Sequence, residues 1–418
     1  MNIQASLDKL FSLHNFGVKL GLENIRNFLN HIGNPQDKLK TIHIAGSNGK
    51  GSTSSFIASI LQESGFRVGL YTSPHFVKFN ERILINGRMI SDDYTAEFID
   101  KHSHYIDEHQ LTFFEVTTAL AFEYFLFQKV DYAIIETGLG GRLDATNVLN
   151  PLACVITSIS LEHTNILGDT IENIAYEKSE IIKKDAKVFM GSLPESAEAL
   201  IEKKCEEVKS QLFFLGEYII EKHNEIILYT EELDFEEWEV PLRGRFQKYN
   251  AALAALVVAK TFEIDDPAII TRGLKNVAKN TGLQGRYEFV RKNPHILVDS
   301  AHNPSGIKCF LEEFKTEKNN YKETILLFGA MRDKNIEEMM TELKGVFNQI
   351  YITEINYERS ALFNQLREVV QRINLDVKEI SDIKSFIKEF LSGDKRNCLV
   401  VTGSMYLLGE VKKILAKL

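Results

Sequence analysis

The stretch His43-Ile44-Ala45-Gly46-Ser47-Asn48-Gly49-Lys50-Gly51-Ser52 joins an apolar, strand-like run to a helix-like segment from Thr53 to Ser64. A glycine-rich turn and one lysine therefore stand at the N-terminus of a helix. Backbone amides freed by the glycines and the positive end of the helix dipole favour phosphate oxygens, Lys50 adds a point charge, and the Ser52 hydroxyl can reach a magnesium ion. The stretch predicts a polyphosphate site.

The spacing of this stretch differs from the usual Walker A pattern. Ile44 stands where the first glycine belongs, and Gly51 separates Lys50 from the hydroxyl residue. An ordinary strand–turn–helix connection is therefore the alternative to nucleotide binding.

Composition narrows the class of protein. At 418 residues the chain is long enough for two or three domains. A net charge of -9 argues against a nucleic-acid surface and favours a small-molecule partner. The four cysteines lie far apart without a C-x-x-C pair, which indicates free thiols. The N-terminus lacks a signal-peptide core, and the apolar run at 251–259 is too short to span a bilayer, so we expect a cytoplasmic protein.

Strand-like and helix-like runs alternate from residue 41 onward. The strand-like runs end in polar turns and lie at 41–44, 68–71, 132–135 and 153–159. This alternation predicts an α/β fold with a parallel sheet, whose ligands bind beyond the carboxyl ends of the strands. Residues 187–240 break the rhythm, and an antiparallel insertion is expected there, with strands near 213–215, 218–221 and 226–230.

A second alternating pattern begins near Arg286. Its strand-like runs lie at 296–298, 324–328, 349–353, 377–380 and 399–402. The polar, glycine-bearing stretch 278–285 is suited to a hinge, so we expect one domain over 1–282 and a second α/β domain over 283–418. Two such domains joined by a hinge favour a cleft that closes on substrates.

A second glycine-rich motif covers residues 135–147. It surrounds Glu136, Arg142 and Asp144 with glycines directly after a strand-like run, and a carboxylate there is suited to magnesium. An exposed turn with a capping aspartate is the alternative. Taken alone, His163 is more often a structural histidine, and Lys178 would normally be a solvated helix lysine.

Together these motifs resemble the Mur ligase superfamily, in the branch of folylpolyglutamate synthases and dihydrofolate synthases, from about residue 20 to the C-terminus. The resemblance implies a P-loop-type ATPase domain with a parallel central sheet, followed by a smaller Rossmann-like α/β domain. The stretches that carry it are Ala45 to Ser52, Thr72-Ser73-Pro74-His75, Asn80-Glu81-Arg82-Ile83, Thr112-Phe113-Phe114-Glu115, Glu136 to Asn147, Gly244 to Ala252, Gly285-Arg286-Tyr287-Glu288, Asp299 to Pro304 and Thr402 to Leu407.

The resemblance implies a role for individual residues. ATP would be held by Asn48, Gly49, Lys50, Gly51, Ser52, Asn250, Arg286 and Asp299. The pteroate site would be lined by Thr112, Phe113, Phe114, Glu115, Leu143, Asp144 and Ala145. Two magnesium ions would be bound by Ser73, Glu136, His163 and a carbamylated Lys178. Lys50, Lys178 and His302 would be catalytic.

Carbamylation of Lys178, giving N6-carboxylysine, would replace a cation that repels magnesium by an anionic oxygen ligand. Ser179-Glu180 stands where the family usually has Ala-Gly, which places another carboxylate near the proposed carbamate. Glu180 could occupy the ligand position itself or point to solvent.

The implied activity is ATP-dependent ligation of L-glutamate to dihydropteroate, to a folate or to both, through an acyl phosphate. We expect a bifunctional bacterial enzyme that is monomeric and binds neither nucleic acid nor membrane. Two other readings remain open: a Mur-type ligase acting on a peptidoglycan precursor, and a regulatory P-loop nucleotide-binding module. Dependence of ADP release on both pteroate and glutamate would separate an enzyme of this kind from a switch.

Overall fold

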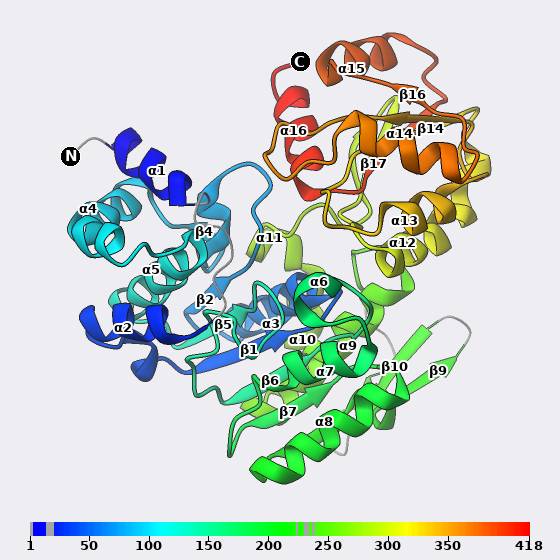
Figure 1. The fold of residues 1–418 in the computed structure, drawn as a ribbon. Coiled ribbons are helices and arrows are strands. Elements are labelled where there is room, and N and C mark those ends of the chain that lie inside the picture. Colours follow the sequence, from blue (N-terminus) through cyan, green and yellow to red (C-terminus); the bar gives the residue numbers. More distant parts are fainter. Residues whose placement is uncertain (1–2, 14–20, 223–224, 230–233, 236–238) are drawn as a thin grey trace. The chain divides into compact units, whose positions relative to one another are not determined.

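The computed structural model describes residues 3–13, 21–222, 225–229, 234–235 and 239–418. The chain forms two compact units (Figure 1). The first comprises Met1–His75, Phe79–Pro241 and Lys248–Leu283, and the second comprises Phe76–Lys78, Leu242–Gln247 and Gln284–Leu418. The roles assigned above to residues 1–282 and 283–418 stay predictions.

The first unit is built on an eight-stranded sheet. In spatial order its strands are β4 (Arg88–Met89), β3 (Ile83–Ile85), β2 (Val68–Tyr71), β5 (Tyr132–Glu136), β1 (Thr41–Ala45), β6 (Ala153–Ile156), β7 (Lys187–Met190) and β8 (Gln211–Phe214). All are parallel from β2 to β8, whereas β3 and β4 are antiparallel at one edge. Every residue of β1 is buried, as expected for a central strand of a parallel sheet.

Helices cover this sheet. They are α1 (Ile3–Ser12), α2 (Glu23–His31), α3 (Lys50–Glu63), α4 (Asp92–Glu108), α5 (Phe113–Phe127), α6 (Thr164–Leu167), α7 (Ile171–Ser179), α8 (Glu195–Val208), α9 (Arg245–Phe262), α10 (Pro267–Lys275) and α11 (Val277–Thr281). One core cluster joins α1, α2, α4 and α5 to β2 and β5, and another joins α7 and α8 to β6 and β7. Helix α3 packs on β1, β2 and β5 and carries α10 and α11.

The parallel strands place the chemical motifs at one edge. Strands β1, β2, β5 and β6 run in the same direction, so the loops that follow them leave the sheet at the same end. These loops begin at Gly46, Thr72, Thr137 and Thr157. The predicted parallel sheet, with its motifs at the strand ends, is therefore confirmed.

Two details of the expected strands are wrong. The strand expected over 153–159 ends at Ile156, because residues 157–160 turn to hydrogen-bond the loop after β1. The expected break at 187–214 is absent, since β7 and β8 continue the parallel sheet with α8 between them. An antiparallel sheet does follow, formed by β9 (Ile219–Lys222), β10 (Glu225–Tyr229) and β11 (Asp234–Phe235). Thr230, at the end of the last expected strand, lies outside the described residues.

The second unit contains a six-stranded sheet. Its strands, in spatial order, are β12 (Glu288–Lys292), β13 (His295–Val298), β17 (Cys398–Thr402), β14 (Thr324–Phe328), β15 (Gln349–Ile352) and β16 (Lys378–Glu379). Only the β12–β13 pair is antiparallel. Five helices accompany the sheet: α12 (Pro304–Glu317), α13 (Ile336–Leu343), α14 (Phe363–Arg372), α15 (Ile383–Ser392) and α16 (Met405–Leu415). Strand β12 was not foreseen.

Two separate core clusters fill the second unit. One contains Phe310, Phe314 and Phe328, and the other contains Leu399 and Val401 together with α15 and α16. The second α/β pattern predicted from the sequence is thus present. Among the described residues, no helix is long and apolar enough to cross a membrane.

Candidate functional site

The loop between β1 and α3 needs its glycines at two positions. A side chain at Gly46 would place its Cβ 1.9 Å from Thr157 Oγ1. Gly49, the N-cap of α3, has a left-handed φ of 86°, and a Cβ there would lie 2.5 Å from Asn250 Oδ1. The loop is therefore closely packed, and Asn250 of α9 lies against it. A shared contact of this loop and Asn250 with ATP stays a prediction.

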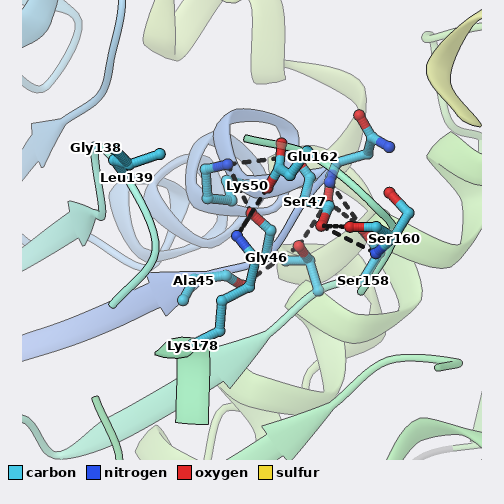
Figure 2. A network of polar contacts seen from close by, with 12 residues as sticks. Ala45, Gly46, Ser47, Lys50, Gly138, Leu139, Ser158, Ser160, Glu162 and Lys178 are labelled. Atoms are coloured by element: carbon cyan, nitrogen blue, oxygen red, sulfur yellow. Dashed lines mark hydrogen bonds and ion pairs between the residues drawn. The ribbon is translucent and has the colours of Figure 1, made fainter. Parts of the chain in front are cut away.

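The loop that follows β6 braces this turn (Figure 2). Ser47 Oγ donates to Ser160 O and accepts from Ser160 N, both at 3.0 Å. Asn48 N donates to Ser158 Oγ at 2.8 Å, and Asn48 O accepts from Thr157 Oγ1 at 2.6 Å. These contacts tie the loop after β1 to the loop after β6, and each loop is anchored by the strand that precedes it. Sequence reasoning missed them because it extended β6 through 159.

Lys50 and Ser52 retain groups that can bind a ligand. Lys50 Nζ donates to the carbonyl oxygens of Gly46 at 2.7 Å and Ser47 at 3.3 Å. The first amides of a helix have no partner within the helix, and α3 begins at Lys50. The hydroxyl oxygens of Ser52, Thr53 and Ser54 are buried without a hydrogen-bond partner in the described structure. Buried polar groups of this kind usually have a partner, so the Ser52 hydroxyl, in the first turn of α3, is a candidate to bind a ligand.

Lys178 is buried beside the same loop. Its Nζ donates to Gly46 O at 3.0 Å and to Glu162 Oε1 at 2.8 Å, and the Lys178 side chain is 1% exposed (Figure 2). Burial lowers the pKa of Lys178, and Glu162 opposes this only in part. Burial alone would raise the pKa of Glu162, but the ammonium groups of Lys178 and Lys50 outweigh it and lower it to about 2. Lys178 is thus a core lysine, unlike the solvated lysine that is usual on a helix.

Glu162 was not singled out from the sequence, although it directly precedes His163. The carboxylate expected near Lys178 was Glu180, but Glu180 Oε1 accepts from Lys204 at 2.5 Å instead. Glu162, and not Glu180, is therefore the carboxylate in contact with Lys178. A glutamate next to a candidate ligand was the only signal that could have found it.

Two of the remaining metal candidates, Ser73 and Glu136, lie at strand ends. Ser73 follows β2, Glu136 ends β5, and Ser73 N donates to Glu136 Oε2 at 3.1 Å. His163, with a left-handed φ of 47°, precedes α6. The structure joins Ser73 to Glu136 and Lys178 to Glu162. Within the described ranges it contains no group of three or more His, Cys, Asp or Glu side chains that could hold a metal ion.

Asp144 is saturated by hydrogen bonds inside its own glycine motif. It accepts from Gly138 N at 2.9 Å, Leu139 N at 2.7 Å, Thr146 N at 3.0 Å and Thr146 Oγ1 at 2.5 Å. Burial raises the pKa of Asp144, while these hydrogen bonds favour its ionised form. Its observed contacts shape the loop, and its contact with a substrate stays a prediction.

The segment Thr112-Phe113-Phe114-Glu115 begins α5 as a capping box. Thr112 N donates to Glu115 Oε2 at 2.7 Å, and Glu115 N donates to Thr112 Oγ1 at 3.3 Å. The Phe114 ring lies directly over Gly138, where a Cβ would come within 2.4 Å of it. The structure therefore brings this segment against the glycine motif.

Two further candidates for the pteroate site belong to the glycine motif at 135–147. Leu143 is half-buried, and Ala145 is part of the core cluster that joins α1, α2, α4 and α5 to β2 and β5.

Three candidates belong to the second unit. Asp299, after β13, accepts from Tyr287 N and Ala301 N, both at 2.8 Å. Burial raises the pKa of Asp299, against these amides and the nearby Arg286. His302 Nδ1 donates to Ser300 O at 2.9 Å. The hydrogen bond from Tyr287 N and the charge of Arg286 acting on Asp299 show that Arg286 and Asp299 lie close together within this unit.

The chain matches two families along most of its length. Residues 44–258 match the Mur ligase middle domain, and residues 285–405 match the Mur ligase glutamate ligase domain. It is 34% identical to a dihydrofolate synthase/folylpolyglutamate synthase of Bacillus subtilis, over 95% of each chain. It is 33% identical to a folylpolyglutamate synthase of Lacticaseibacillus casei, over 94% of this chain and 93% of the relative.

Solved structures agree with this assignment. Folylpolyglutamate synthase from Thermotoga maritima superposes with a TM-score of 0.84 at 32% identity, covering 100% of this chain and 98% of that one. The Mycobacterium tuberculosis enzyme complexed with ADP and AMPPCP superposes with a TM-score of 0.87 at 26% identity, covering 99% of each chain. The chain belongs to the Mur ligase family, in the branch of the dihydrofolate synthases and folylpolyglutamate synthases.

Proposed function

We propose that this protein is an ATP-dependent ligase that joins L-glutamate to the carboxyl group of dihydropteroate, of a folate or of both. The observation that supports the proposal is the braced loop between β1 and α3, where Lys50 donates only to loop carbonyl oxygens and the Ser52 hydroxyl has no partner among the described residues. The family relationship supplies the acceptor and the amine, because relatives of the same length carry these names.

The reaction needs an activated carboxyl group, since a carboxylate is a poor electrophile. An acceptor carboxylate oxygen attacks the γ-phosphorus of ATP, and the bond to the β-phosphate oxygen breaks, giving an acyl phosphate and ADP. The glutamate amine then attacks the acyl carbon, and phosphate leaves from the tetrahedral intermediate with loss of a proton from nitrogen. Lys50 would exchange its two carbonyl contacts for phosphate oxygens and stabilise the charge that moves during transfer.

Magnesium fits the oxygen groups at the strand ends. The Ser52 hydroxyl has no partner within the ranges that the structure describes, and the Glu136 carboxylate lies at the end of β5 beside Ser73. Hydroxyl and carboxylate oxygens are the ligands that this ion prefers. Ser52, Ser73 and Glu136 would hold the ion, which supplies neutralisation of phosphate charge when it is bound with ATP. His163 and a carbamylated Lys178 are the further ligands that the family resemblance proposes.

The test is an acceptor-dependent ATPase assay. We expect ADP release with ATP, magnesium, glutamate and either pteroate or folate, and little release when the acceptor or glutamate is left out. Mass spectrometry should find a product heavier than the acceptor by one glutamyl residue. ADP release that ignores both the acceptor and glutamate would favour a nucleotide-binding module and would contradict the proposal.

A further inference from the structure

Arg82 is a buried cation next to the site that none of the roles above explains. It ends the short 3-10 helix Phe79–Arg82 before β3, and its side chain is buried, with 4% of the residue exposed. Its carbonyl oxygen accepts from Thr72 N at 3.0 Å, which anchors it beside the loop after β2. The sequence motif that contains it was recognised, but no function was attached to Arg82.

The charge of Arg82 has no anionic partner in the part of the chain that the structure describes. Its Nε donates to His75 Nδ1 at 2.9 Å, and its guanidinium carbon lies 5.1 Å from the centre of the Phe113 ring. An imidazole that accepts through Nδ1 is neutral, so His75 does not compensate the charge. Arginine keeps its proton in proteins, and a buried charge is normally paired.

Arg142 shows how an arginine is usually paired with a carboxylate. Arg142, which is more exposed than Arg82, binds one oxygen of Glu177 through Nε at 3.0 Å and through Nη2 at 2.9 Å. A buried guanidinium without a carboxylate partner lowers the stability of the ligand-free protein, because its lost hydration is not compensated. Proteins often accept such a loss of stability at residues that bind a ligand.

The surroundings of Arg82 indicate what the missing anion is. The Phe113 ring beneath the guanidinium faces Phe11 of α1 at a centroid distance of 6.3 Å with nearly parallel planes, and Phe11 is 40% exposed. Nε is used by His75, and the two Nη groups have no hydrogen-bond partner among the described residues, so they form a fork whose geometry matches a carboxylate. Flat aromatic side chains next to such a fork suit an aryl carboxylate.

We propose that Arg82 binds a carboxylate group of the pteroate or folate acceptor. This inference rests on the proposed function and adds the residue that recognises the acceptor's charge. The phosphate groups of ATP have their own loop after β1, whereas Arg82 follows β2 and stacks on Phe113, at the start of α5. Arg82 is thus a specificity residue for the acceptor.

The first experiment measures acceptor binding without ATP and glutamate. Calorimetry compares pteroic acid with its primary amide on the parent chain, Arg82→Met and Arg82→Lys. The parent should prefer the acid by on the order of 10- to 100-fold, because the amide cannot accept a bidentate charged contact. Arg82→Met should lose this preference, and Arg82→Lys should keep part of it. Arg67→Met, which removes an exposed arginine before β2, is the control and should behave like the parent.

Thermal unfolding separates ligand recognition from a structural role. If Arg82 holds the fold together, Arg82→Met should lower the melting temperature without ligand. Our proposal predicts instead that this temperature stays within a few degrees of the parent, since an unpaired buried charge is removed, while the increase caused by pteroic acid disappears. A large loss of stability without ligand, with acid selectivity kept in Arg82→Lys and Arg82→Met alike, would overturn the proposal.

Steady-state kinetics then identify which carboxylate is bound. A raised KM for pteroate, alone or together with folate, supports the proposal, and so does a raised KM for folate alone, which would place a glutamyl carboxylate on Arg82. A change confined to the KM of glutamate or ATP would overturn it. If Arg82→Met prefers pteroic acid over its amide as strongly as the parent does, the inference about Arg82 is wrong and the proposed ligase function is unaffected. If the parent protein binds neither pteroate nor folate, the proposed function itself is contradicted.

Discussion

Two loops that follow parallel strands hold their polar groups in opposite ways. In the described part of the chain, the lysine in the loop after β1 donates only to carbonyl oxygens, and the Ser52 hydroxyl has no partner. After β13 in the second unit, both oxygens of Asp299 accept backbone amides. The first loop has unused binding capacity, and the second uses its carboxylate to shape its own turn.

The difference separates groups that await a ligand from groups that build the frame. Asp144 belongs with Asp299, because four donors saturate it. Ser52 and Arg82 belong to the other class, because the Ser52 hydroxyl and the Arg82 charge have no matching partner among the described residues. Lys50 joins them because its ammonium donates to carbonyl oxygens that a phosphate could replace. Substitutions of the groups that shape a loop, Asp144 and Asp299, should change stability, and substitutions of the groups that await a ligand should change activity.

Lys50→Ala should have the largest effect on activity. We expect acceptor-dependent ADP release to fall on the order of 100-fold or more, because Lys50 acts on charge that develops during phosphoryl transfer. The melting temperature should change little, since the hydrogen bonds of this lysine to described residues go to two carbonyl groups of its own loop. Lys38→Ala, at an exposed position before β1, is the control. Comparable ADP release in folded Lys50→Ala and the parent would end the nucleotide assignment.

Lys178 tests whether one residue can belong to both classes. Its ammonium is paired with Glu162 in the structure, yet the family resemblance predicts a carbamate there. If the carbamate forms, Lys178→Ala should lose ligase activity on the order of 100-fold and recover part of it with formate or acetate, which restore an anionic oxygen. Lys178→Arg should stay inactive, because a guanidinium does not take up carbon dioxide.

An unmodified lysine mass in active enzyme prepared with bicarbonate would refute the carbamate. Full activity of Lys178→Ala would refute it too, and both results would leave the ligase assignment standing. The lowered pKa of Lys178, caused by burial, favours the neutral amine that reacts with carbon dioxide.

Glu136→Gln and His163→Ala should change the magnesium requirement by a smaller amount. Each removes a proposed ligand from an ion that ATP also holds, so the magnesium concentration for half-maximal ADP release should rise about tenfold. Glu136 should matter more, because imidazole is an unusual ligand for this hard ion. A titration of His163→Ala that matches the parent would make His163 a structural residue that starts α6.

The sequence predicted the sheet and the motif positions better than the contacts between them. Apolar runs and turns located β1, β2, β5 and the strands of the second unit other than β12, because burial and period-two patterns are local signals. The pairing of Lys178 with Glu162 and of Glu180 with Lys204 depends on which helix and loop meet in space, and nothing in the local pattern carries that information. The same holds for the unpaired charge of Arg82.

The smallest effect on ligase activity should come from His43, a structural residue in the middle of β1. Burial, with a contribution from Lys183, lowers the pKa of His43 to about 3. Thr146 gives its hydroxyl proton to Asp144, so it must accept from His43 Nε2 at 2.8 Å. The Nδ1 atom is then unprotonated and buried without a partner in the described structure. A proton added there would meet no acceptor.

Because the pKa of His43 is lower in the folded chain than its usual value of 6.5, the unfolded chain binds this proton first as the pH falls. The free energy of unfolding should therefore decrease between pH 6.5 and about pH 3, by at most about 1.4 kcal/mol per pH unit from this residue. Urea titrations of His43→Gln should show a shallower loss over that window than the parent, while ligase activity at neutral pH stays within a few-fold. His104→Gln, whose side chain is 92% exposed, should follow the parent. If the free energy of unfolding falls equally steeply with decreasing pH in His43→Gln and in the parent, other groups cause the acid sensitivity and His43 contributes nothing to it.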